Sequence, residues 1–153
     1  MQTYVLQDWV SINGAAGGNP VIQTEQGWLD LSPFQDLVAW IDMPQATGSP
    51  SNPTLFLETS PSKDDVLFVS MNGATGYPLS TAAMPTVASL LLGVANTPLA
   101  TFLRWRIVGP TGAWNASFRI TISVNSPGWL VPDATSPGTF KLPLSSPAAL
   151  GMK

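Results

Sequence analysis

The chain has 153 residues, the length of one ordinary domain, and 44% of them are hydrophobic, so a core can form. Only 10% are charged, the net charge is −3 at pH 7, and histidine and cysteine are absent. These counts exclude His- or Cys-based nucleophiles, zinc or haem sites with those ligands, and disulfides. Six basic residues are also too few for a typical nucleic-acid surface, so no nucleic-acid partner is expected.

Short segments of alternating apolar and polar residues, bounded by Gly, Pro, Asn and Ser, run along the chain and predict β-strands. Segment 13–27 is glycine-rich with little periodicity and predicts an extended loop, whereas segment 37–43 is mostly apolar and could be buried on both faces. Segment 86–94 fits a strand or a short helix after Pro85, and we favour the strand. The remaining predicted strands cover residues 4–12, 28–31, 54–59, 66–70, 102–108 and 114–125.

The firmest local prediction is a hairpin that joins segments 102–108 and 114–125 through a Gly-Pro-Thr-Gly turn at 109–112. One register places the apolar residues of both strands on one dry face. The same register gathers Arg104, Arg106 and Arg119 on the wet face. These arginines could form a positive spot for a partner, or they could pair within the chain with carboxylates such as Asp42 or Glu58.

Seven or eight short strands predict an all-β fold, an antiparallel β-sandwich of jelly-roll-like topology that occupies residues 1–125. Residues 126–153 contain five prolines and several large apolar side chains. Proline is excluded from helix interiors and central strands, so we expect an extended arm that docks on its own sandwich or on a neighbouring subunit. The arm contributes Trp129, Leu130, Phe140 and Leu142 to the candidate interface residues.

Tryptophan placement separates core from surface candidates. Trp40, Trp105 and Trp114 fall on apolar strand positions and are predicted to be buried, whereas Trp9 and Trp28 flank loops. Exposed tryptophan suits a protein interface or a sugar platform. The spacing of the acidic residues singles out no carboxylate pair, so we expect no enzyme activity, metal or cofactor.

The strand pattern of residues 37–125, including 37–42, 55–61, 102–107 and 112–120, resembles small β-sandwich structural proteins of tailed bacteriophages, among them capsid decoration or cement proteins. This resemblance implies a virion component that forms dimers or trimers and binds at junctions of major capsid protein subunits. The same sandwich also resembles carbohydrate-binding and discoidin-like domains. Fold analogy leaves function open between these two classes.

We therefore expect a non-enzymatic virion protein, assembled in the host cytoplasm, whose partners are the major capsid protein or another virion protein and further copies of itself. The alternative is a carbohydrate- or receptor-binding module of the phage-tail or discoidin-like kind. No membrane partner is expected, because the longest apolar run, near residues 87–94, is far shorter than the roughly 20 residues that span a bilayer.

Overall fold

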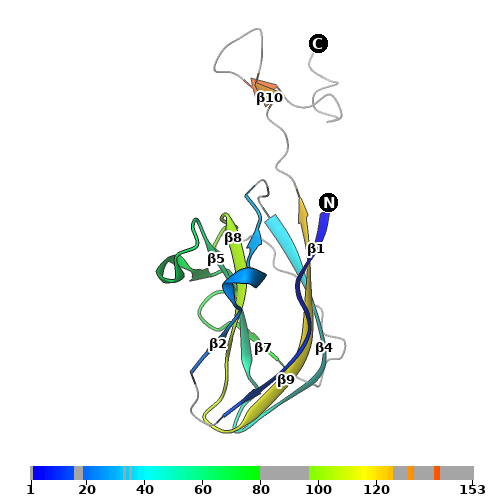
Figure 1. The fold of residues 1–153 in the computed structure, drawn as a ribbon, viewed down its shortest axis with the longest axis vertical. Helices are drawn as coiled ribbons and strands as arrows, with labels where there is room; N and C mark the ends of the chain where they lie inside the picture. The colour runs from blue at the N-terminus through cyan, green and yellow to red at the C-terminus, as the bar shows by residue number, and fades with distance from the viewer. Residues whose placement is uncertain are drawn as a thin grey trace.

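Two antiparallel sheets pack against each other and form a β-sandwich (Figure 1). Sheet A has the strand order β1 (Gln2–Gly14), β9 (Trp114–Asn125) and β4 (Asp36–Gly48). Sheet B is built around β8 (Phe102–Val108) and β5 (Thr54–Ser60). This computed structural model describes residues 2–15, 19–32, 34, 36–79, 97–125, 131–132 and 140–141. The predicted all-β antiparallel sandwich is confirmed.

The remaining elements are short. In sheet B, β2 (Val21–Ile22) and β3 (Leu29–Asp30) pair with β8, while β6 (Val69–Ser70) and β7 (Tyr77–Pro78) pair with β5. Two 3-10 turns, η1 (Glu25–Gly27) and η2 (Asp65–Leu67), lie in the connections. β10 (Val131–Pro132) pairs with β11 (Phe140–Lys141). Within the described part of the chain, no helix is long and apolar enough to cross a bilayer.

The core lies between the sheets and follows the alternation of the long strands. Phe118, Ile120 and Ile122 of β9 are fully buried and face the apolar side chains of sheet B. Trp105 of β8 packs edge-on against Phe118, with ring centroids 5.3 Å apart, and so joins the two layers. Burial of each such side chain contributes roughly 1.5–3 kcal/mol, which makes this layer contact the main source of stability.

The predicted hairpin between segments 102–108 and 114–125 is wrong. β8 pairs with β5 in sheet B, and β9 lies between β1 and β4 in sheet A, so the connection at 109–113 crosses from one sheet to the other. Both strands still present their apolar residues to the core. The alternation of apolar and polar residues shows which side of a strand faces the core. That side is the same whether the two strands pair in a hairpin or lie in two facing sheets.

Trp114 accounts for the crossing at this end of the sandwich. Its indole is buried against the backbone of Gly14 and Gly109, where a Cβ atom on either glycine would overlap the ring. The backbone N–H of Gly112 donates to the Ser49 carbonyl over 2.8 Å, which ties the connection to the end of β4. A bulky indole between two glycines therefore closes the core where a hairpin turn was expected.

Other local predictions also change. β4 is buried on one face only, and Trp40 projects from its other face with 46% of its surface exposed, so its predicted burial is wrong. Segment 66–70 begins as the turn η2 rather than as a strand. Loop 13–27 contains β2 and η1, which cover an edge of sheet B. Segment 86–94 lies outside the described residues, and the jelly-roll topology and the arm at 126–153 stay predictions.

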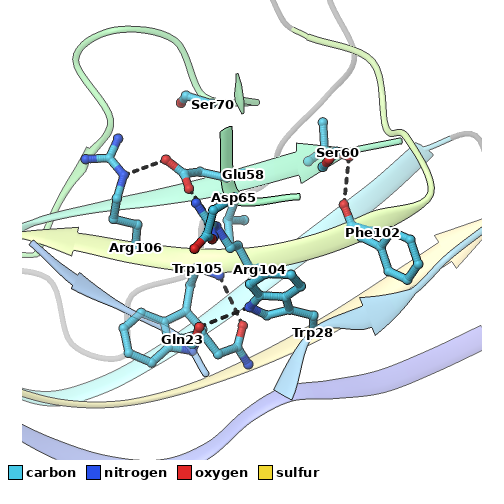
Figure 2. Close-up of polar contacts among 12 residues, drawn as sticks. Gln23, Trp28, Glu58, Ser60, Asp65, Ser70, Phe102, Arg104, Trp105 and Arg106 are labelled. Carbon is cyan, nitrogen blue, oxygen red and sulfur yellow. Dashed lines mark hydrogen bonds and ion pairs between the residues drawn. The ribbon is translucent and has the colours of Figure 1, made fainter. Parts of the chain in front are cut away.

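The buried side-chain amide of Gln23 holds the two sheets together. A bulge leaves Leu6 of β1 without a partner in β9, and Gln23 Nε2 donates to the Leu6 carbonyl over 2.7 Å. The same nitrogen donates to the Gly27 carbonyl, and Gln23 Oε1 accepts the backbone N–H of Trp105 in β8 over 3.2 Å (Figure 2). One side chain thus satisfies polar groups of both sheets, which would otherwise be buried without partners.

We predict that Gln23→Leu lowers the free energy of unfolding by about 2–4 kcal/mol, because the Leu6 carbonyl and the Trp105 N–H lose their partners. Urea unfolding followed by tryptophan fluorescence measures the change. The matched control is Gln26→Leu, at an exposed position of η1, which should change stability by no more than about 0.5 kcal/mol. Equal losses in the two variants would contradict this role of Gln23.

Candidate functional site

Two of the three arginines meet on the outer face of sheet B. Arg104 lies directly opposite Glu58 in the β5–β8 ladder, and its Nε atom is 2.9 Å from Glu58 Oε2. Arg106 Nε is 2.5 Å from the other carboxylate oxygen of Glu58 (Figure 2). Arg104 also pairs with Asp65 of η2. Two cations and two anions therefore form a neutral cluster, the Glu58 cluster.

Aromatic rings cover this cluster. The Arg104 guanidinium lies 3.8 Å from the ring centroid of Phe68 and 5.2 Å from that of Trp28, and these two rings pack edge-on. Arg106 lies 4.5 Å from the ring centroid of Phe56. Arg104 and Glu58 are each only 4% exposed, so they are charges in the protein interior that hydrogen bonds and cation–π contacts stabilise.

The third arginine lies on the opposite side of the molecule. Arg119 of β9 donates to Asp42 of β4 over 2.9 Å, and its guanidinium lies 5.0 Å from the ring centroid of Trp9 on β1. The predicted common face for Arg104, Arg106 and Arg119 is therefore wrong, because β8 and β9 belong to different sheets. The alternative prediction, that Glu58 and Asp42 neutralise the arginines within the chain, is confirmed.

The outer face of sheet A, which we call the tryptophan face, is open to solvent. Trp9 is 50% exposed and Val5 of the same strand is 56% exposed. Trp40 reaches from β4 to β9, where its Nε1 atom donates to Ser123 over 3.3 Å. Short polar side chains fill the rest of the face and bond one another, as in the pairs Ser11–Ser117 and Thr47–Asn115. This face therefore carries few charges and is partly apolar.

A second exposed apolar surface lies at η2, and we call it the β5–β6 tip. It consists of Val66, Leu67 and Val69, which are exposed, and Val66 has 86% of its surface in solvent. Asp64 caps the turn by accepting the backbone N–H of Val66 over 3.1 Å. Because Asp65 pairs with Arg104, the Glu58 cluster fixes the base of this tip. The apolar side chains then project outward from a fixed turn.

The carboxylates of the described residues serve local structure. Glu58, Asp65 and Asp42 pair with arginines, and Asp64 caps η2. The backbone N–H of Ser32, helped by its side chain, lowers the pKa of the exposed Asp30 carboxyl below its ordinary value. A general acid at neutral pH needs the opposite shift. Across the ranges that the structure describes, no three or more carboxylates gather as a metal site.

The other interface candidates have different outcomes. Trp28 is half-buried and belongs to the cover of the Glu58 cluster rather than to a free surface. Trp129, Leu130 and Leu142 lie outside the described residues, and Phe140 is described only as part of the strand β11.

Sequence reasoning missed Trp40 and the β5–β6 tip. Trp40 alternates with Leu37, Ala39 and Ile41, so strict two-residue periodicity already placed it on the face opposite the core. The tip follows two consecutive aspartates, and the first of them is a good cap for a turn. In both cases the apolar composition suggested burial. The position of each residue along the strand or turn was the better indicator of its exposure to solvent.

Comparison of the chain with protein-family models, curated proteins and solved structures gives no match. The geometry described above is therefore the basis on which function is inferred.

We predict that Glu58→Gln destabilises the fold by about 3–5 kcal/mol, because Arg104 and Arg106 lose the buried carboxylate between them and Arg104 keeps only the exposed Asp65 as a partner. Thermal and urea unfolding measure the loss. Glu25→Gln is the control, since its pair with Lys63 is solvent-exposed and 3.6 Å long and should contribute no more than about 1 kcal/mol. If Glu58→Gln unfolds like the control, the Glu58 cluster does not stabilise the sandwich.

Proposed function

We propose that this protein is a non-enzymatic structural subunit of a virion, of the capsid decoration or cement type, which binds major capsid protein subunits through exposed apolar surfaces. The observation that supports it most directly is the β5–β6 tip, where Val66, Leu67 and Val69 are exposed together on a fixed turn. Grouped apolar side chains in water are unfavourable and mark interaction sites in soluble proteins.

The distribution of charge favours the same proposal. The three arginines are neutralised by carboxylates of the same chain, so the protein has few charges with which to hold a polyanion or steer a charged substrate. Permanent protein interfaces are more apolar and less charged than transient ones. A subunit that stays bound in an assembly can carry apolar, weakly charged surfaces, because its neighbours cover them.

The particular assembly is inferred from the resemblance of residues 37–125 to small sandwich proteins of tailed phages. Those proteins bind at junctions between major capsid subunits, where a projecting apolar tip can insert between neighbours. The predicted arm at 126–153 would add contact area to such an interface. On this proposal the protein acts in the virion after assembly in the host cytoplasm, without a cofactor, a nucleic acid or a membrane.

A carbohydrate-binding module is the second candidate, and the tryptophan face favours it. Trp9 and Trp40 are both half-exposed on β1 and β4, which flank β9, so they stand on the order of 10 Å apart. Two indoles on a flat sheet can stack on sugar rings. However, hydroxyls of this face already bond one another, as Ser11 and Ser117 do over 2.7 Å, which leaves fewer groups for sugar hydroxyls.

We predict that the double variant Val66→Ser/Leu67→Ser loses at least about 90% of its binding to capsids of the virus that encodes the chain, because the tip no longer buries apolar surface there. Co-sedimentation of the full chain with purified capsids measures bound protein. Ile22→Ser is the matched control, an isolated exposed apolar residue on β2, and it should bind normally.

The competing outcomes separate the two candidates. A native chain that does not co-sediment with capsids, and is absent from purified virions, contradicts the virion proposal. A hit on a glycan array that Trp9→Ala and Trp40→Ala both abolish supports the carbohydrate-binding candidate instead. Unchanged tryptophan fluorescence on titration with sugars, together with an empty array, rejects that candidate.

A further inference from the structure

We propose that the tryptophan face of sheet A binds the same face of a second copy of this chain, so that the protein forms a two-fold dimer with sheets stacked face to face. The resemblance implies dimers or trimers but no contact surface, and this inference names the surface. It does not depend on capsid binding, because the β5–β6 tip that would contact capsids belongs to the outer face of sheet B.

The size of the face matches what a stable dimer needs. Three adjacent strands are about 14 Å wide at the usual strand spacing of ~4.8 Å. The 12 residues of β9 extend over about 40 Å at roughly 3.3 Å per residue. Full overlap of two such faces buries about 1,100 Å² in total, just above the roughly 1,000 Å² expected of a specific interface. The exposed apolar residues lie on both outer strands, Val5 and Trp9 on β1 and Trp40 on β4, and Trp40 reaches Ser123 of the central strand β9.

Charge on this face is self-complementary. Arg119 and Asp42 are direct neighbours in the β9–β4 ladder, so the face presents a cation and an anion side by side. In a two-fold pair the Arg119 of each copy can meet the Asp42 of the other. Both side chains keep about two fifths of their surface exposed, which leaves donor and acceptor groups free for such an exchange. Several of the remaining polar side chains are short and bond one another, as Ser11–Ser117 and Thr47–Asn115 do, which lowers the cost of removing water from them.

The edges of sheet A favour stacking over strand addition. β1 and β4 are its outer strands among the described elements, and each departs from regular pairing with β9. β1 shifts register on both sides of Gln7, and β4 does so between Asp42 and Gln45, where Pro44 lies. Bulges and proline are the features that prevent edge-to-edge pairing of strands. A second copy is therefore expected on the face rather than along an edge.

Sedimentation equilibrium of the full-length chain tests the dimer. We expect a dissociation constant on the order of 1 μM, typical of a modest interface. Trp40→Ser and Trp9→Ser should each raise it about 30-fold or more, as expected for central aromatic residues. Ile22→Ser, on sheet B, should leave it unchanged. Circular dichroism of each variant shows whether its fold is intact.

A charge-mixing experiment gives a sharper result. Arg119→Asp gives the face two anions and Asp42→Arg gives it two cations, so each variant alone should be monomeric at about 100 μM. An equimolar mixture of the two should form a heterodimer with about the native affinity. Because recovery requires two folded partners, it cannot arise from damage to either variant.

The proposal is overturned if the native chain is monomeric at about 100 μM, or if the tryptophan variants dimerise as well as the native chain. A mixture of the charge variants that stays monomeric overturns the proposed facing of Arg119 and Asp42. Shielding of Trp9 and Trp40 from acrylamide in a proven monomer would show that another part of the same chain covers the face. A monomer that still binds capsids refutes the dimer alone, whereas a dimer that ignores capsids refutes the virion role alone.

Discussion

The carboxylate of Glu58 is the interaction on which the arrangement of this protein depends. It lies in the middle of β5, is almost fully buried, and binds the guanidinium groups of Arg104 and Arg106 at once. Arg104 in turn pairs with Asp65 and so fixes η2. The rings of Trp28 and Phe68 lie against the Arg104 guanidinium and cover the cluster. A chain with only six basic residues thus uses two of them in one internal ion-pair cluster, with Arg104 buried and Arg106 partly exposed.

This placement makes the two outer faces of the sandwich unequal. In the middle of sheet B, rings and η2 cover Arg104 and Glu58, and the β5–β6 tip projects beside them. Sheet A has no comparable cover among the described residues, and its outer face exposes Trp9, Trp40 and a single ion pair. The low charge of the sequence therefore corresponds to a molecule with internal ion pairs and apolar outer surfaces, which suits a subunit of an assembly.

The sequence predicted the fold class and the dry face of each long strand, because alternation is a local property that burial dictates. It could not predict which strands are neighbours. Leu103 and Phe118 share one core whether their strands pair in a hairpin or lie in two facing sheets. Strand length agrees with the observed pairing, since the seven residues of β8 match those of β5 and the 12 of β9 match the long β1 and β4. The apolar segment 37–43 showed only part of β4, so this length could not be read from the sequence. The partners of Arg104 and Arg106 followed from that pairing and not from the alternation itself.

Hydroxyl-radical footprinting of the individual tryptophans tests the central claim most directly, namely that sheet A is the face covered by association while the charges stay paired inside. Oxidation of Trp9 and Trp40 should be fast in dilute protein and should fall several-fold when the protein associates. The buried Trp105 and Trp114 should react slowly in both states. Equal oxidation of Trp9 and Trp40 in the dilute and the associated protein would contradict the account.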